Sequence, residues 1–313
     1  MGRTVQTLPR PGCLVELTRR TIQGRFLFRP SPELNALIVG VLAKAQEQTG
    51  MKIHAVHFAS NHYHLLISPR TIEQMADFTR HLGTNLSKEV GRLHDWPGSL
   101  FEGRSRPIPV SDEEQAQAQR LIYILGQATK DNLVASPADW PGVHVINALV
   151  RDEPLRGTWI DRTALHARRQ RGEDVAPADV SSEMTLELSP LPCWSSVTPA
   201  EYRRRVQTLV AEIEHQGAAT RVRERITPLG VRTVLKQRPH HRPEALERRP
   251  APRFHAFSET ARRQLETGYR AFLIAYREAA DRLKRGQPDV VFPESCFPPR
   301  PPARPPQPPL EPG

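Results

Sequence analysis

Apolar and polar residues follow two different periods in the first half of the chain. Short apolar-rich runs bounded by turn residues predict extended segments at 14–20, 25–28, 52–69 and 99–110. The segment at 52–69 is expected to form two strands, because Ser60 and Asn61 interrupt it with a turn. These segments are too short to be helices and are typical of a sheet.

Longer segments carry apolar residues three and four positions apart, which predicts amphipathic helices at 31–50 and 71–94. Ser31 and Gly50 supply the expected caps of the first of these. A third helix is expected from Ser111 to about residue 132, because a glutamate three positions after Ser111 forms a capping-box pattern.

The order strand, helix, strand, strand, helix, strand predicts an α+β fold with a ferredoxin-like (RRM-like) antiparallel sheet and flanking helices. We expect this domain to occupy residues 1–150. Residues 151–287 are predicted to form a basic and mostly helical extension, with helices at 199–215 and 258–285. The last 26 residues, 288–313, contain 11 Pro and are expected to be disordered.

The net charge indicates which class of partner the protein binds. The chain has 44 basic and 34 acidic residues, a formal charge of +10, and only 6 of the basic residues are Lys. Arginine suits bidentate phosphate contacts, so nucleic acid is favoured over a membrane, although a GC-rich genome would explain the arginine bias equally well. Residues 1–150 hold 16 basic and 13 acidic side chains (+3), and residues 151–313 hold 28 and 21 (+7).

The cysteine content and the lengths of the apolar runs indicate in which cellular compartment the protein is expected. Cys13, Cys193 and Cys296 are odd in number and far apart, which excludes a disulfide framework and a thiolate zinc site. No run of 18 apolar residues is present, and the first residues lack an apolar signal core. We therefore expect a cytoplasmic protein with no membrane partner.

Two histidines on one predicted strand are the first candidates for chemistry. His62 and His64 are two positions apart, so both imidazoles leave the same face of a strand and could share one metal ion. The spacing alone is a weak signal, because a strand histidine is more often an ordinary polar residue. His54 and His57 lie nearby and are interpreted as structural or substrate-contacting.

The third predicted helix carries a second group. Tyr123 and Gln127 are four positions apart and share one helix face with Arg120 and Lys130. A tyrosine hydroxyl in water has a pKa of about 10 and is a weak nucleophile at neutral pH, unless a cation beside its target stabilises the developing charge. The alternative is that Tyr123 packs in the core among its apolar neighbours.

These residues together resemble a known family. The sequence Asn61-His62-Tyr63-His64-Leu-Leu on a central strand, with Tyr123 and Gln127 on a later helix, is similar to the single-tyrosine HUH transposases, and most of all to the REP-associated tyrosine transposases. The resemblance covers residues 12–150. The sequence departs from the REP-associated group at two positions. That group usually has Asn-Pro where this chain has Gln127-Ala128, and an aliphatic residue or Phe where this chain has Tyr63.

The resemblance implies a function. It implies that Tyr123 is the nucleophile and that His62, His64 and Gln127 bind Mg²⁺ or Mn²⁺. It also implies that the substrate is single-stranded or hairpin DNA, cleaved and rejoined through a 5′-phosphotyrosine without ATP. Relatives of this kind include monomers and dimers, so a homodimer is one alternative.

Several arginines are candidates for DNA binding. Arg104 and Arg106 are expected on one side of the strand at 99–110, where they would form a phosphate track with Arg19, Arg20, Arg120 and Lys130. Exposed arginines on an edge strand are equally typical of solubility. Two other functions stay open: a non-catalytic protein that binds DNA hairpins, and, more weakly, a zinc hydrolase that uses the clustered histidines.

Overall fold

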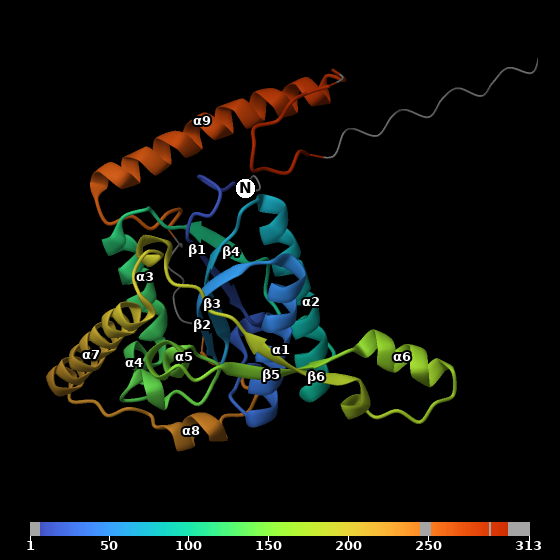
Figure 1. Cartoon of the computed structure of the whole chain (residues 1–313), viewed down its shortest axis with the longest axis vertical. Helices are drawn as coiled ribbons and strands as arrows, with labels where there is room; N and C mark the ends of the chain where they lie inside the picture. Colours follow the sequence, from blue (N-terminus) through green and yellow to red (C-terminus); the bar gives the residue numbers. More distant parts are fainter. Residues whose placement is uncertain (1–6, 245–251, 288, 300–313) are drawn as a thin grey trace, which may run out of the picture.

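The computed structural model describes residues 7–244, 252–287 and 289–299. Its centre is a four-stranded antiparallel sheet in the order β2-β3-β1-β4. The strands are β1 (Val15–Arg20), β2 (Lys52–Ala59), β3 (His62–Ser68) and β4 (Arg106–Pro109). This order confirms the predicted ferredoxin-like sheet (Figure 1).

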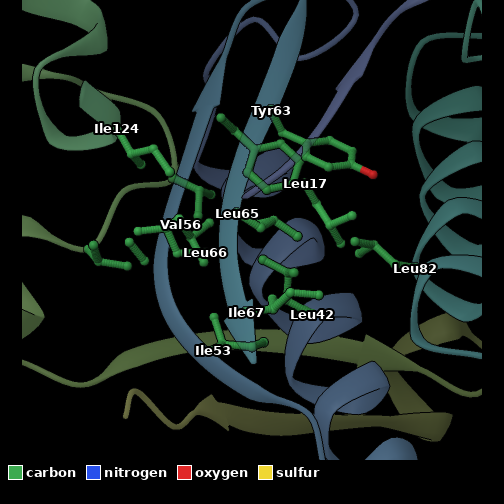
Figure 2. Close-up of a cluster of buried hydrophobic side chains, with 14 of the residues drawn as sticks. Leu17, Leu42, Ile53, Val56, Tyr63, Leu65, Leu66, Ile67, Leu82 and Ile124 are labelled. Carbon is green, nitrogen blue, oxygen red and sulfur yellow. The ribbon is translucent and has the colours of Figure 1, made fainter. Parts of the chain in front are cut away.

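Two helices, α1 (Pro32–Thr49) and α2 (Ile72–Leu93), cover one face of the sheet (Figure 1). The Ser31 hydroxyl accepts a hydrogen bond from the Leu34 amide at the start of α1, and Gly50 ends the helix in the left-handed conformation. Both predicted caps are therefore confirmed. Between this helix pair and the sheet lies the main apolar core, which includes Leu17, Leu42, Leu65 and Leu82 (Figure 2).

The opposite face of the sheet is covered by α3 (Glu114–Leu125), α4 (Gln127–Lys130) and α5 (Ile146–Arg151) (Figure 1). The prediction of one helix capped by Ser111 is wrong in two ways. The Ser111 hydroxyl donates to the Glu113 carboxylate instead, so α3 begins at Glu114. The helix is also interrupted at Gly126, which lies against Ile213 of a later helix.

One predicted strand is absent and another is shorter than expected. Residues 25–28 form no strand, and β4 occupies only the end of the segment 99–110. Phe101 still pairs with Thr21, but the chain then bends away from the sheet at residues 102–103 and returns at Arg106. Short 3₁₀ turns lie at Ile22–Gly24, Pro137–Asp139, Pro177–Val180 and Pro192–Trp194.

The extension is less purely helical than predicted. It contains a β-hairpin of β5 (Leu155–Ile160) and β6 (Ser181–Leu186) in addition to the helices α6 (Arg162–Gln170), α7 (Pro199–Glu224), α8 (Val231–Lys236) and α9 (Glu259–Lys284). Buried side chains of the extension join the same apolar cluster as the first 150 residues; they are Leu186, Leu191, Trp194, Val206 and Ile213. The ferredoxin-like sheet and the extension therefore share one core.

The Pro-rich tail lies mostly outside the described residues, and its predicted disorder stays a prediction. Residues 289–299 contain no helix or strand. Over the part of the chain that the structure describes, we find no helix with the length and apolar character needed to cross a membrane.

Gly40 gives a test of how β5 packs on α1. A Cβ atom at Gly40 would collide with the backbone of Thr158, so the two elements touch because this position has no side chain. We expect Gly40→Ala to lower the free energy of unfolding by about 1–3 kcal/mol, as overpacking does. Gly268→Ala in α9, where a Cβ meets nothing within 4 Å, should raise it by up to about 1 kcal/mol. Urea unfolding followed by circular dichroism measures both, and equal stability of Gly40→Ala and wild type would contradict this account.

Candidate active site

The two histidines of β3 lie on the face of the sheet that α3 covers. His64 pairs with Thr18 of β1 and His57 of β2, and His62 pairs with Arg20. Directly paired strand residues project from the same face, so all of these side chains gather there. The imidazole centroids of His62 and His64 are 5.0 Å apart with the rings nearly perpendicular. The structure thus places both imidazoles on one face, as predicted.

Tyr63, between these histidines, points the opposite way. Its ring packs against Phe28, Phe58 and Phe101, and Figure 2 shows it on the α2 side of the sheet. Burial raises the pKa of the Tyr63 hydroxyl above its usual value. Tyr63 is therefore a core residue, separated by the sheet from the histidine pair.

A buried carboxylate orients His64. The Nδ1 of His64 donates to Oε1 of Glu16 at 2.8 Å, and His255 Nε2 lies 2.8 Å from the other oxygen of this carboxylate. Arg120 Nη1 reaches the same oxygen at 3.5 Å. Burial alone would raise the pKa of Glu16, but the hydrogen bonds from His255 and His64 hold it well below the ordinary value of a glutamate. Glu16 is thus an anion beneath the site, and the sequence analysis did not identify it.

His62 is held in a comparable way. Its Nδ1 donates to Oδ1 of Asn61 at 2.7 Å. Burial, with the nearby His64 and Arg20, lowers the pKa of His62 to about 3, so this ring is neutral at physiological pH. Among the described residues no partner is recorded for Nε2 of either His62 or His64. Imidazoles whose Nδ1 is fixed by a hydrogen bond and whose Nε2 is free match the arrangement of metal-ligating histidines.

The ring of Tyr123 lies next to the imidazole of His64. Its ring centroid is 5.5 Å from that of His64, at 87°. The Cζ of Arg120 and the Nζ of Lys130 lie 4.5 Å and 4.8 Å from the Tyr123 ring centroid. The ring contacts the core at its edge but is only partly buried. Arg120, three positions before Tyr123, and Lys130, seven positions after it, therefore lie against its ring together with His64 of β3.

Gln127 lies one turn further along, buried to 4% exposure. Its Nε2 donates to the backbone carbonyl of Tyr123 at 3.0 Å, which leaves its Oε1 available as an acceptor. Within residues 7–299, as far as the structure describes them, no three His, Cys, Asp or Glu side chains could hold a metal ion by themselves. The residues present fit a divalent ion held by two imidazole nitrogens and an amide oxygen.

The candidate DNA-binding arginines divide between the two faces of the sheet. Arg20 pairs with His62, and Arg106 pairs with Thr18, so both project from the histidine face. Arg19 pairs with Tyr63 and lies over the ring of Phe101 at 3.8 Å, on the other face.

Arg104 lines a cavity on that other face together with Arg19 and Pro107. The prediction that Arg104 and Arg106 share one side of a strand is wrong, because β4 begins only at Arg106. Arg20 and Arg106, with the helix cations Arg120 and Lys130, are left on the face of Tyr123.

The other two clustered histidines differ from each other. His54 is bonded at both ring nitrogens, to the carbonyls of Ser189 and Pro190 and to the Ser68 hydroxyl, which is a structural role. His57 is 2% exposed, packs against Trp140, and its Nε2 has no hydrogen-bond partner among the described residues.

Comparisons with known proteins give few matches. No protein-family model matches the chain, and no curated protein matches it. Among solved structures, it is similar to a REP-associated tyrosine transposase bound to a REP hairpin, with 14% identity over 48% of this chain and 84% of the other and a TM-score of 0.39. It is also similar to a protein of Deinococcus radiodurans R1 provisionally named a transposase, with 21% identity over 39% and 94% of the two chains and a TM-score of 0.27.

Proposed function

We propose that this chain is a metal-dependent single-stranded DNA endonuclease and strand transferase of the tyrosine transposase type. The observation that carries the proposal is the position of Tyr123, next to the His62–His64 pair and between Arg120 and Lys130. A nucleophile, two ligand-competent imidazoles and two cations gathered on one face of the sheet suit attack on a phosphodiester.

His62 and His64, through their Nε2 atoms, and Gln127, through Oε1, would hold Mg²⁺ or Mn²⁺. When bound, such an ion supplies polarisation of a phosphoryl oxygen and stabilises the charge that develops on it. Glu16 contributes by fixing the orientation of the His64 ring.

In the proposed reaction the Tyr123 hydroxyl oxygen attacks the scissile phosphorus. A bond forms between this oxygen and phosphorus, the bond from phosphorus to the 3′ oxygen breaks, and the tyrosine proton is balanced by protonation of the departing 3′ oxygen. The products are a 5′-phosphotyrosine and a free 3′-OH. Attack of a 3′-OH on the phosphotyrosine reverses the exchange, so rejoining requires no ATP. Arg120 and Lys130 offset the negative charge of the phosphate beside the ring.

The test is capture of the covalent product. The full chain is incubated with Mn²⁺ and a pool of hairpin-bearing single strands with randomised flanks, labelled at either end. A denaturing gel is expected to show a protein–DNA band that carries the 3′ label and not the 5′ label, because the protein keeps the 5′ phosphate of the downstream fragment. Binding without any such band would contradict the enzymatic proposal and favour a non-catalytic hairpin-binding protein.

A further inference from the structure

The segment 252–258, which precedes α9, brings a histidine of the extension to the edge of the sheet. The amide of His255 donates to the Pro109 carbonyl at 2.9 Å, and its carbonyl accepts from the Ser111 amide at 2.8 Å. These bonds form a parallel bridge between His255 and Val110, just after β4. The backbone therefore places residue 255 beside the strand that neighbours β1.

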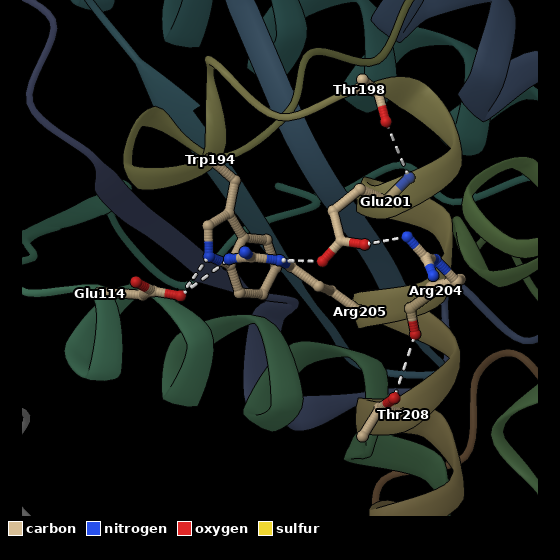
Figure 3. A network of polar contacts seen from close by, with 7 residues as sticks. All are labelled: Glu114, Trp194, Thr198, Glu201, Arg204, Arg205 and Thr208. Atoms are coloured by element: carbon tan, nitrogen blue, oxygen red, sulfur yellow. Dashed lines mark hydrogen bonds and ion pairs between the residues drawn. The ribbon is translucent and has the colours of Figure 1, made fainter.

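Two adjacent glutamates at the start of α3 anchor the extension to the helix of the proposed nucleophile. Glu113 accepts hydrogen bonds from the backbone amides of residues 257–258, at 2.9 Å and 3.1 Å. Glu114 accepts from the Trp194 indole and from Arg205 of α7 (Figure 3). The segment before α9 is thus fixed to α3 by contacts that do not involve its histidine side chain.

The imidazole of His255 reaches the buried carboxylate that orients His64. Nε2 of His255 lies 2.8 Å from Oε2 of Glu16, and Nδ1 of His64 lies 2.8 Å from Oε1. The Glu16 side chain is only 3% exposed. An ionised carboxylate can only accept hydrogen bonds, so each of these ring nitrogens carries the proton that is shared. Glu16 therefore bridges one imidazole of the sheet and one of the extension.

Arg120 does not take the place of His255 on this carboxylate. Its Nη1 is 3.5 Å from Oε2 of Glu16, which is long for a hydrogen bond, and its Cζ lies 4.5 Å from the Tyr123 ring centroid. His255 is the close donor to Oε2. Donors on both oxygens fix the plane of a carboxylate, and with it the direction in which Oε1 faces His64.

We propose that His255 is a positioning residue of the active site, which holds Glu16 so that Glu16 orients His64 toward the metal ion. The inference rests on the proposed function, since it takes His64 as a metal ligand. It gives the extension a part in the site: the first 150 residues carry the nucleophile and the ligands, and residue 255 completes the contacts that orient one of them.

Mn²⁺ affinity of the full chain without DNA, followed by electron paramagnetic resonance of free Mn²⁺, tests this. His255→Leu removes the donor and should weaken Mn²⁺ binding about fivefold, the effect of one lost hydrogen bond. His255→Gln places an N–H near the position of Nε2 and should stay within about twofold of wild type. The matched control is His166→Leu on the exposed surface of α6, which should leave the affinity unchanged.

A double-mutant cycle separates positioning from a general structural role. In a Glu16→Ala background, His255→Leu should change Mn²⁺ affinity less than about twofold, because the carboxylate that His255 holds is gone. An equal loss in both backgrounds would overturn the proposal. So would a His255→Leu chain that melts like wild type in EDTA and binds Mn²⁺ equally well.

Nitrogen NMR of the histidine-labelled chain in EDTA gives a readout without metal. The ring signals of His64 are identified by their loss in His64→Gln. The Nδ1 signal should move in His255→Leu and keep its position in His255→Gln, and an unmoved signal in His255→Leu contradicts the proposal. A wild type that binds no Mn²⁺ contradicts both this inference and the proposed function. Absence of the covalent band, with the expected Mn²⁺ and NMR changes present, contradicts the proposed function alone.

Discussion

Tyr123→Phe is expected to abolish the covalent protein–DNA product, by a factor of at least about 10³, while DNA affinity changes little. The substitution removes only the hydroxyl, for which no hydrogen bond is recorded among the described residues. The ring keeps its position beside His64, Arg120 and Lys130, so folding and the DNA-binding surface are retained. Gel quantification of the band and fluorescence anisotropy with the same labelled pool measure the two effects.

Tyr63→Phe is the matched control for this prediction. The Tyr63 hydroxyl is 3.4 Å from the Ser105 hydroxyl on the far face of the sheet, so its removal should leave the band intact. A band that survives Tyr123→Phe and disappears with Tyr63→Phe would show that the wrong tyrosine has been assigned.

The part of the fold set by local periodicity could be predicted from the sequence. The short apolar-rich runs of β2 and β3 and the capped amphipathic pattern of α1 are properties of neighbouring residues, and they led to the correct fold class. The hairpin of β5 and β6 was missed; its backbone at Thr158 and Gly157 lies against Gly40 of α1, a contact between segments far apart in the sequence. The break at Gly126 was also missed; this glycine lies against Ile213 of α7, which is distant in sequence.

Some residues of the candidate site could also be predicted from local spacing, and others could not. The pairing of His62 with His64, and of Tyr123 with Gln127, follows from strand and helix spacing alone. Glu16 and His255 come together only in the folded chain, because residues 252–258 return to the edge of β4. One signal was present: Glu16 is a single charge between Val15 and Leu17, inside an apolar run. A charge that the pattern directs to a buried position indicates a buried partner.

The role of Glu16 leads to the second large effect. Because Glu16 holds Nδ1 of His64, it fixes the ring orientation and tautomer that leave Nε2 free for a metal ion. Loss of a carboxylate in this position typically weakens metal binding about 10–100-fold. The prediction concerns affinity in the absence of DNA, so it can be measured independently of the covalent product.

Glu16→Gln is therefore expected to lower Mn²⁺ affinity about 10-fold, and Glu16→Ala up to about 100-fold, in titrations followed by electron paramagnetic resonance of free Mn²⁺. Glutamine keeps an oxygen that accepts from His64 but loses the negative charge, so its effect should be the smaller. Glu183→Ala is the control, since Glu183 pairs with Arg156 at the surface, away from the site. Thermal melting in EDTA identifies any variant that is merely unfolded. A folded Glu16→Ala chain that binds Mn²⁺ as tightly as wild type would show that Glu16 does not position a metal ligand.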